Sequence, residues 1–377
     1  LILMQRKKIH ILEFICPTGF YGAERWILAL AKHLPTDLVR CDLAVTLESS
    51  SMDLEVVKKY RQGYGDAFEI PMNNRFDPGV INKIVALIKE RDIDIIHTHG
   101  YKSDILGVIA ARKAGIKCVV TPHGFENARD LKLRIFIWLG SRAMRFADRV
   151  VPLSPKLMDD VRQMGIKEEK LLYIQNGADL SEIEEQRRSG EPLGTIKGEK
   201  RIGFIGQLIS RKNVFDILDI FDTLSAKHSD IQLVLVGDGD QRAELQSYAE
   251  KLDSYQKIEF LGFRDDRLEL LKTFDLFVMT STLEGIPRCL MEACAMGVPV
   301  AAYNIPGIDE LITHEETGLL ASPGDKKTLA LYWEKLLFDR QVAMDLAGNA
   351  RQHVHTHYSA RRMAREYLDL FEQLTGN

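Results

Sequence analysis

Thr280–Ala302, TSTLEGIPRCLMEACAMGVPVAA, reads as a strand end, a tight turn, a buried helix and a second strand. Gly285 lets the backbone approach a ligand closely, and Pro287 suits the first helical position, where its missing N–H costs nothing. The free N–H groups of the next turn and the helix dipole can hold an anion. Glu292 falls in the second turn, where its carboxylate can accept two hydrogen bonds from a vicinal diol. A phosphate beside a ribose indicates a nucleotide site; the alternative is a buried helix with two solvated acids, Glu284 and Glu292.

Size and composition predict two domains of a globular protein. The chain has 377 residues, 45% of them hydrophobic and 28% charged, and domains average about 150 residues. The net charge of −4 argues against a nucleic-acid binder. Residues 1–180 carry a net charge of +5 and the remainder −9, an asymmetry that can mark a membrane-facing or anion-facing half.

Cysteine use and hydropathy indicate a cytoplasmic protein. The five cysteines form no C-x-x-C pair, which fits reduced, buried thiols. Leu1–Phe14 shows no signal peptide, and no apolar run approaches the roughly 20 residues that span a bilayer.

The first half alternates short apolar runs with amphipathic ones, which predicts a doubly wound parallel sheet. Lys8–Cys16 is the first expected strand, followed by a loop that ends at Gly22 and can hold a phosphate or an acceptor. His97, His99 and His123 follow later strands, at the ends where such sheets bind ligands. A metal site at His97 and His99 would need a third ligand, and the sequence shows none at a suitable spacing. The alternative to a ligand-binding role is that His97 and His99 are a chance pair on the surface.

Three further stretches are expected to form a helix and a strand of the first domain and the linker that follows it. Leu131–Arg149 mixes five cations with apolar residues; it is a helix packed on the domain, or alternatively a basic amphipathic surface for anionic lipid. Lys170–Ile174 is an expected strand. Leu180–Lys200 lacks an apolar period and is interpreted as a linker.

The second half restarts with a strand, Arg201–Ile205, followed by GQLISRKN. Gly206 turns the chain, and Arg211 and Lys212 present two cations before a helix, which suits a departing diphosphate; the alternative is a solvated basic turn. Farther on, GDGDQR is not the dinucleotide fingerprint, because Arg242 takes the third glycine position. Its Asp238-Gly239-Asp240 also spells a D-x-D metal motif.

These motifs together resemble the retaining GT-B glycosyltransferases of family 4, the group 1 type. The two acids of the opening stretch match the E-x₇-E signature of that family, and GQLISRKN is similar to its G-R-L-x-x-x-K-G motif. TPHG, NGAD and VGDG follow one another along the chain in the same order as in the family. The resemblance implies that GDGD carries no metal. Gln207 stands where an arginine is usual and Asn213 replaces a glycine. Phe20 and Tyr21 split the glycines of the N-terminal loop.

The resemblance implies an α/β protein with the GT-B fold, two Rossmann-like doubly wound domains facing a cleft. The expected acceptor domain spans 1–180, the linker 181–200 and the nucleotide-sugar domain 201–355. A C-terminal helix, 356–377, is expected to cross back to the first domain.

The resemblance also implies the residues of a site that needs no metal. His123 and Glu284 orient the donor sugar, while Lys212 and Arg211 stabilise the departing diphosphate. His97 and His99 line the acceptor side. The residues implied in donor binding are Gly22, Gly206, Gly262, Phe263, Gly285, Ile286, Pro287, Arg288 and Glu292.

The implied function is a hexosyltransferase of EC class 2.4. It moves a sugar, with retention, from a UDP- or GDP-linked donor to a saccharide or lipid-linked acceptor in polysaccharide or lipopolysaccharide synthesis. A cytoplasmic enzyme with peripheral contact to anionic membrane is expected. The alternatives are a sugar-nucleotide 2-epimerase on the same fold and a non-catalytic sugar-nucleotide-binding protein.

Overall fold

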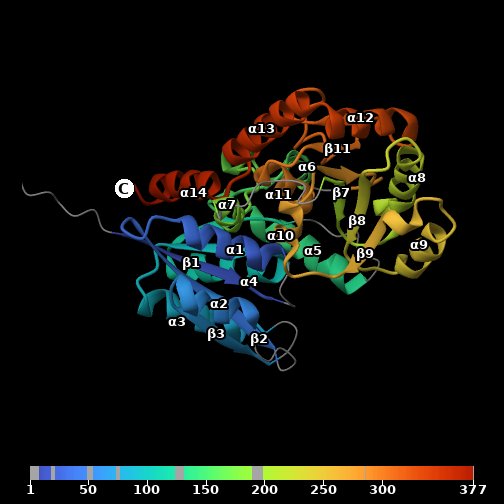
Figure 1. Cartoon of the computed structure of the whole chain (residues 1–377). Coiled ribbons are helices and arrows are strands. Elements are labelled where there is room, and N and C mark those ends of the chain that lie inside the picture. The colour runs from blue at the N-terminus through green and yellow to red at the C-terminus, as the bar shows by residue number, and fades with distance from the viewer. Residues whose placement is uncertain are drawn as a thin grey trace, which may run out of the picture. The chain divides into compact units, whose positions relative to one another are not determined.

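The chain forms two compact units, each with its own sheet and hydrophobic core (Figure 1). The structure is a computed structural model that describes residues 8–17, 22–48, 54–73, 77–123, 131–188, 198–284 and 286–376, without the side chains of 48 and 131–137. The first unit comprises residues 1–179 and 360–377, and the second comprises residues 180–359.

Part of the predicted linker is a helix of the second unit. Helix α7 (Ser181–Arg188) buries Ile183, and Arg187 Nη1 donates a hydrogen bond to the carbonyl of Met296, 2.9 Å away. The linker prediction is therefore wrong over this helix, because one buried isoleucine per two turns is too weak a period to recognise. Residues 189–197 lie outside the described residues.

The first unit is built on a parallel sheet in the order β3-β2-β1-β4-β5-β6. Every residue of β1 is buried, as expected for a parallel strand covered on both faces. The predicted strand over Lys170–Ile174 is wrong, since it forms only an isolated bridge between Val150 and Leu171. The strands are β1 (Ile9–Ile15), β2 (Val39–Glu48), β3 (Ala67–Met72), β4 (Ile95–His99), β5 (Lys117–Val120) and β6 (Arg149–Val150).

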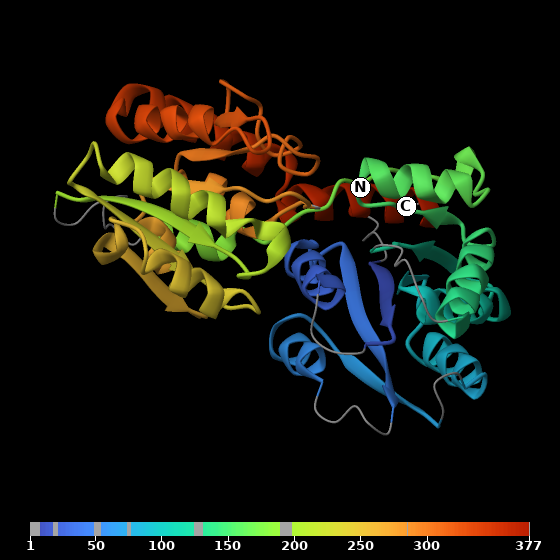
Figure 2. The same ribbon diagram turned by 90° about the vertical axis from the view of Figure 1, so that its right-hand side faces the viewer.

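Helices cover both faces of this sheet (Figure 2). Successive residues of β1 serve different cores, because side chains alternate along a strand. Ile11 packs in a cluster with α1, α2 and α14, whereas Leu12 packs in a cluster with α3 and α4. The helices are α1 (Gly22–His33), α2 (Glu55–Gly63), α3 (Gly79–Glu90), α4 (Tyr101–Ala114), α5 (Leu131–Met144), α6 (Pro155–Gln163), the 3₁₀ turn η1 (Glu168–Lys170) and α14 (Ala360–Thr375).

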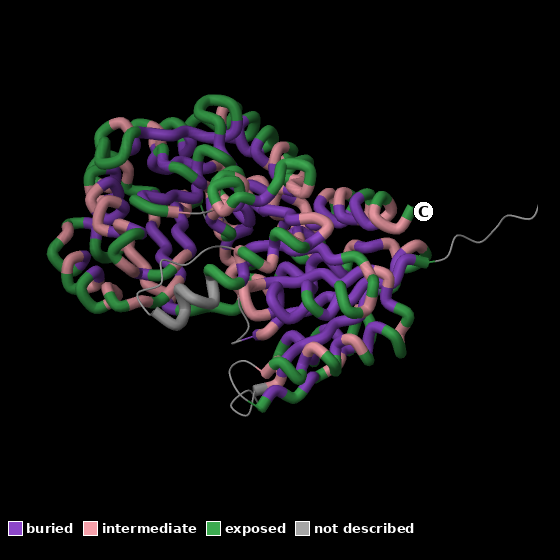
Figure 3. Tube along the Cα trace, turned by 180° about the vertical axis from the view of Figure 1, so that it is seen from behind, coloured by how far each residue is buried: buried purple, intermediate pink, exposed green. Residues whose placement is uncertain are grey.

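The second unit repeats this topology with its own sheet, β12-β11-β10-β7-β8-β9. Its core includes fully buried Trp333 and Phe221. Figure 3 shows buried stretches of the chain in the interior and exposed stretches at the periphery. Its strands are β7 (Lys200–Ile205), β8 (Ile231–Val236), β9 (Ile258–Gly262), β10 (Leu276–Met279), β11 (Val300–Tyr303) and β12 (Leu319–Ala321). Its remaining helices are η2 (Ser210–Lys212), α8 (Val214–Ser225), α9 (Arg242–Ala249), η3 (Tyr255–Lys257), α10 (Arg267–Lys272), α11 (Arg288–Met296), α12 (Lys326–Phe338) and α13 (Arg340–His357).

Each sheet has one point at which the strand order reverses. It lies between β1 and β4 in the first unit and between β7 and β10 in the second. Ligands of doubly wound sheets bind beyond the carboxyl ends of the strands at such a point. Among the described residues, no helix is both long and apolar enough to cross a membrane.

A buried acid in the first unit makes stability depend on pH. Asp104 on α4 is fully buried, and its Oδ1 accepts a hydrogen bond of 2.7 Å from Thr98 Oγ1 on β4. Oδ2 has no partner among the described residues. Burial raises the pKa of Asp104 to about 8, against a small opposite effect of the Thr98 hydrogen bond.

We expect the free energy of unfolding of Asp104→Asn to exceed that of the unmodified protein at pH 8 by on the order of 5 kcal/mol, and the difference to vanish below pH 4. The raised pKa means that the folded state keeps a proton which the unfolded state loses above pH 4, so stability falls as pH rises toward 8. Asparagine has no such proton. Urea unfolding at several pH values measures the effect. Asp148→Asn is the control, because its carboxylate bonds Cys118 N and Lys117 and its loss should destabilise at pH 8.

Candidate active site

In the second unit, two loops meet where the strand order reverses. One follows β7 and contains η2, and the other follows β10. Thr282 N donates to the carbonyl of Arg211 at 2.8 Å, and Thr280 Oγ1 donates to that of Asn213 at 2.8 Å. These bonds hold together two segments about 70 residues apart in sequence, because β7 and β10 are neighbours in the sheet.

The two loops bring Lys212, Arg211 and Glu284 into one cluster. Lys212 Nζ lies 2.5 Å from Glu284 Oε1, and Arg211 Nη1 lies 3.3 Å from Glu284 Oε2. The side chains of Lys212 and Glu284 are 8% and 5% exposed, whereas that of Arg211 is 43% exposed. Two cations share one carboxylate, so the cluster carries an excess positive charge that can attract an anion. Gln207, exposed at the usual arginine position, adds no charge.

Asn213 takes a left-handed conformation, φ 49° and ψ 47°, directly before α8. Asparagine tolerates this region better than most residues, which explains how it replaces the expected glycine. Its Nδ2 donates to Asp216 Oδ2 at 2.8 Å. Asn213 is therefore compatible with the backbone conformation that the family's glycine would adopt in this loop.

The second acid of the opening stretch lies on α11. The helix begins at Arg288, and Pro287 precedes it in an extended conformation, so Pro287 is the N-cap residue and not the first helical residue. Glu292 is buried. Its Oε1 accepts from Arg267 Nη2 and Arg288 Nε, both at 2.8 Å, and its Oε2 accepts from Arg267 Nε at 3.2 Å.

The prediction that the Glu292 carboxylate is free to bind a ribose diol is corrected by its pairing with Arg267 and Arg288. Each carboxylate oxygen has two lone pairs, so Oε1 is saturated and Oε2 keeps one. A diol can take both of its bonds only if Arg288, 48% exposed, turns away. Arg267 was missed by the sequence reasoning, since nothing in its local spacing singles it out. Ile286 is partly exposed, and Gly285 lies outside the described residues.

Glycines let the turns after β7, β8 and β9 pack closely. Gly237 has φ 141°, and a Cβ there would lie 1.8 Å from the carbonyl oxygen of Gly206. Gly237 N donates to the carbonyl of Gly262 at 2.8 Å. Beyond Gly262, the ring of Phe263 is 75% exposed, free to stack on a flat ligand.

Asp238, the first acid of the D-x-D pattern, has its own partners in the protein. Asp238 accepts hydrogen bonds of 2.8 Å from Arg242 Nη1 and from Gly239 N. The Gly239 bond, followed by Arg242, lowers the pKa of Asp238. Asp238 therefore forms an ion pair and a backbone hydrogen bond at this turn, and the absence of metal at Asp238 and Asp240 stays a prediction.

In the first unit, the predicted histidines cluster at the strand-order reversal. His97 Nδ1 lies 3.1 Å from Glu13 Oε1, His99 Nε2 lies 2.5 Å from Glu13 Oε2, and His99 Nδ1 lies 3.0 Å from His123 Nε2. Glu13, on β1, is the register partner of His97 on β4. His97 and His99 are buried, whereas His123 is partly exposed.

This geometry corrects two predictions for the histidines. The side chains of His97 and His99 are both fully buried, so neither lines an acceptor site. The sequence offers no third metal ligand near His97 and His99, but Glu13 supplies one, and the three ligand atoms lie within 4.8 Å of one another. Glu13 was missed because it stands inside an apolar strand, 84 residues from His97.

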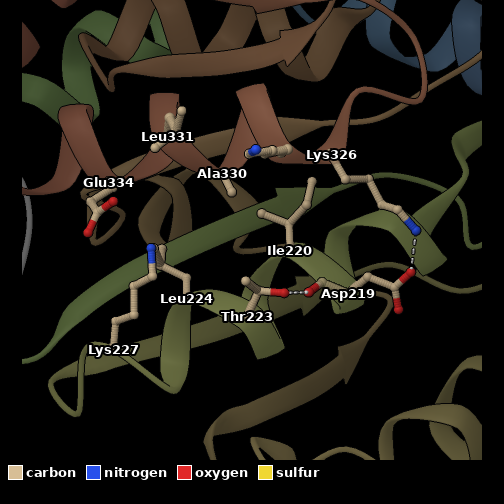
Figure 4. Close-up of a pocket in the computed structure, with 10 residues that line it drawn as sticks. Asp219, Ile220, Thr223, Leu224, Lys227, Lys326, Ala330, Leu331 and Glu334 are labelled. Carbon is tan, nitrogen blue, oxygen red and sulfur yellow. Dashed lines mark hydrogen bonds and ion pairs between the residues drawn. The ribbon is translucent and has the colours of Figure 1, made fainter.

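Two other features lie outside these clusters. Gly22 begins α1, and a Cβ there would meet no atom within 4 Å; residues 18–21 lie outside the described residues. A groove of about 480 Å³ between α8 and α12 is lined by Asp219, Lys227, Lys326 and neighbouring residues (Figure 4). None of the predicted site residues lines it.

The two-unit fold is shared with solved structures of other proteins. The structure of the Anabaena protein HepE in complex with UDP matches with a TM-score of 0.77 and 22% sequence identity, covering 97% of this chain and all of that one. Two Rossmann-like units with a basic cluster at a strand-order reversal thus define a GT-B protein.

Sequence comparison identifies the family. Residues 20–182 match Glycosyltransferase Family 4, and residues 185–353 match Glycosyl transferases group 1. The chain therefore belongs to the family 4, group 1 glycosyltransferases and is a transferase.

Two curated relatives are named for lipid-linked acceptors. One is the Escherichia coli UDP-Gal:α-D-GlcNAc-diphosphoundecaprenol α-1,3-galactosyltransferase, 28% identical over 78% of this chain and 79% of the relative. The other is the Campylobacter jejuni N,N′-diacetylbacillosaminyl-diphospho-undecaprenol α-1,3-N-acetylgalactosaminyltransferase, 26% identical over 78% of this chain and 81% of the relative.

Proposed function

We propose that the protein transfers a hexose, with retention, from a UDP- or GDP-linked donor to a lipid-linked saccharide during synthesis of a cell-surface glycan. The observation that carries this proposal is the Lys212–Glu284–Arg211 cluster at the strand-order reversal of the second unit. The names of the two relatives support the lipid-linked acceptor and, for the Escherichia coli enzyme, a UDP-linked donor.

In this proposal the second unit holds the nucleotide and stabilises the leaving group. Lys212 and Arg211, with the N–H groups at the start of α11, face the diphosphate as its charge grows. Glu284 fixes the Lys212 ammonium in a nearly dry position and accepts a hydrogen bond from the sugar. Phe263 stacks on the base, and Glu292 reaches the ribose. The leaving phosphate takes the proton of the acceptor hydroxyl, so the protein supplies no nucleophile.

The test is a screen of nucleotide sugars, read first as thermal stabilisation and then as turnover with lipid-linked saccharides. A ligand that binds the folded state raises stability by about 2.7 kcal/mol at a hundredfold excess over Kd. We expect a UDP- or GDP-sugar to stabilise the protein and to be consumed only with an acceptor.

The same assay with EDTA tests the role of metal. We expect turnover to survive chelation, because Lys212 and Arg211 occupy the place of the cation. Loss of turnover restored by Mn²⁺ or Mg²⁺ would contradict this and point to Asp238 and Asp240, or to Glu13, His97 and His99. Conversion without acceptor would identify an epimerase, and binding without turnover a non-catalytic protein.

We also propose that α4 and α5 of the first unit form a surface for anionic lipid. Four large apolar side chains on these helices and in the turn after α5 are 40% to 59% exposed: Ile109, Trp138, Leu139 and Phe146. Arg142 lies over the Trp138 ring at 4.4 Å and Arg112 over the Phe146 ring at 5.0 Å. Exposed aromatic rings beside cations suit the headgroup region of a bilayer, where a lipid-linked acceptor resides.

Flotation with lipid vesicles tests this surface. We expect binding to phosphatidylserine vesicles but not to neutral ones, and binding should fall in 1 M salt, where the screening length is about 3 Å. Arg112→Gln with Arg142→Gln should weaken binding about tenfold or more, since each basic residue contributes about 1 kcal/mol. The matched control replaces Lys227 and Lys327 of the groove in Figure 4. Equal binding to neutral and anionic vesicles would contradict the proposal.

A further inference from the structure

From the two arginine pairs of Glu292, we infer that Arg288 is a specificity-determining residue that exchanges partners. It holds Glu292 in the free protein and moves to the diphosphate when a nucleotide binds. The exchange couples the ribose contact to the phosphate contact, so the site favours ligands that carry both groups. The identity of the ligand rests on the proposed function, whereas the contacts of the free state belong to this chain.

The two arginines hold Glu292 unequally. Arg267 donates to Glu292 through both Nε and Nη2, and its side chain is 28% exposed. Arg288 donates through Nε alone, at 2.8 Å, and its side chain is 48% exposed. A single ion pair at a half-exposed surface contributes little, because water screens it. Arg288 is therefore the partner that can leave Glu292.

The departure of Arg288 does not leave a buried charge unpaired. The side chain of Glu292 is only 6% exposed, so an isolated carboxylate there would be costly. Arg267 remains, with one hydrogen bond to each carboxylate oxygen. Oε1 of Glu292 then has one open lone pair beside the open lone pair of Oε2. Two acceptor sites on neighbouring oxygens are what the two hydroxyls of a ribose require.

Arg288 is poorly placed as a purely structural cation. It is the first residue of α11, whose first turn contains no acid, and the helix dipole disfavours positive charge at that end. Nη1 and Nη2 of Arg288 make no hydrogen bond with any residue that the structure describes; its bond to Glu292 comes from Nε. A guanidinium with this open fork suits two oxygens of a phosphate.

The start of α11 lies near the cluster proposed for the diphosphate. Burial raises the pKa of the Cys289 thiol to about 11; Lys212 acts against burial and lowers this pKa, whereas Glu292 and Glu284 raise it. The thiol next to Arg288 in the chain is therefore within electrostatic reach of Lys212 and of both acids. A diphosphate beside Lys212 offers Arg288 a second acceptor in place of Glu292.

The exchange has a consequence for ligand preference. A nucleoside without phosphate competes with Arg288 for Glu292 and offers the arginine no new partner. A nucleoside diphosphate supplies that partner as its ribose takes the carboxylate. Ribose and phosphate therefore bind cooperatively, and Arg288 strengthens the preference for the diphosphate over the nucleoside.

Calorimetric titration with UDP, GDP, uridine and guanosine tests this exchange without any turnover. We expect Arg288→Ala to weaken the diphosphate that binds by about tenfold or more. The same change should tighten the matching nucleoside about two- to fivefold, the scale of one half-exposed ion pair. Arg288→Lys keeps the charge without the fork and should retain part of the diphosphate affinity.

The matched control is Lys326→Ala. Lys326 is 45% exposed and ion-paired with Asp219 at 2.7 Å, in the groove of Figure 4. Its loss removes the same charge from the same unit at nearly the same exposure. Both affinities should stay unchanged in this variant.

Inorganic pyrophosphate tests the exchange from the other side. Glu292→Ala releases Arg288 and should tighten pyrophosphate about two- to fivefold. The gain should be smaller in a protein that also carries Arg288→Ala, because the arginine that is released is then absent. An equal gain in both backgrounds would show that Arg288 does not move to the phosphate and would overturn the inference.

Opposite changes in nucleoside and diphosphate affinity distinguish the exchange from simpler roles. If Arg288→Ala weakens both ligands, Arg288 only supports Glu292; if nucleoside affinity is unchanged, Arg288 is a phosphate ligand without exchange. Either result overturns the inference. Arg288→Gln gives the same reading if alanine at this position impairs folding. If neither UDP nor GDP binds the unmodified protein, the proposed function is contradicted, and the exchange with it.

Discussion

Lys212→Ala is expected to lower kcat by roughly a hundredfold or more at saturating donor, the scale of removing one preorganised donor from a site where charge develops. The Lys212 ammonium is 8% exposed and held by Glu284, so it needs little rearrangement when the glycosidic bond breaks. Because charge builds on the phosphate oxygens in the transition state, the loss should appear in kcat more than in nucleotide affinity. Steady-state turnover and calorimetric titration with the nucleoside diphosphate measure the two quantities.

The control for this variant is a folded protein that keeps the charge. Removing Lys212 leaves Glu284, only 5% exposed, with Arg211 as its remaining cation, and breaking a buried ion pair can destabilise by about 3–5 kcal/mol. Lys212→Arg keeps the charge and should retain more turnover than Lys212→Ala at equal folded fraction. Lys227→Ala, a cation in the groove of Figure 4, should leave kcat unchanged. Normal kcat in folded Lys212→Ala would remove Lys212 from the mechanism.

Arg211 should be tested in the same way as Lys212. The family's usual arginine is replaced here by Gln207, so a second cation for the diphosphate must come from another residue. Arg211 Nη1 bonds both Glu284 and the carbonyl of Leu283, at 3.3 and 3.2 Å, so it is tied to the site although 43% exposed. We expect Arg211→Ala to lower kcat by a similar factor, about a hundredfold, and Gln207→Arg to restore part of it. Unchanged kcat in Arg211→Ala would leave Lys212 and the helix start as the only stabilising groups.

Much of the fold could be predicted because its signals are local. The strands β1, β5 and β7 are short apolar runs, and the loops that follow them carry glycine, cations or histidine. A parallel sheet places the carboxyl ends of its strands on one edge, so residues after successive strands were expected to meet. Lys212 and Glu284 do so, although nothing between them in the sequence indicates their ion pair.

The remainder of the site depends on which strands are neighbours. In the sequence, Glu13 is only a polar residue within an apolar strand. Its contacts with His97 and His99 arise because β4 lies beside β1 in the sheet. Arg267 is the first residue of a six-residue helix. Its part in the site is its pairing with the carboxylate of Glu292 on α11. Tyr367 lies on a helix that is distant in sequence from everything it touches in the cluster. Such contacts arise from tertiary packing, which periodicity and spacing do not report.

The pairing of Glu292 with two arginines shapes the second large expected effect. Glu292→Ala should weaken the nucleoside diphosphate by about 10- to 150-fold, since hydrogen bonds to a charged group are each worth about 1.5–3 kcal/mol. The same change frees Arg267 and Arg288, which can then attract phosphate more strongly. Total affinity alone therefore mixes a lost ribose contact with a gained phosphate contact.

Comparing ribose with 2′-deoxyribose separates these two effects, because the deoxy ligand keeps every phosphate contact. If Glu292 holds the diol, the unmodified protein should prefer the ribonucleotide by about tenfold, and Glu292→Ala should bind both ligands equally. Glu292→Gln retains one acceptor and should keep part of the preference. Arg288→Ala removes the partner that occupies Oε1 of Glu292 and should sharpen the preference. A preference for ribose that survives in folded Glu292→Ala would assign the diol to another residue and leave Glu292 as the anchor of the two arginines.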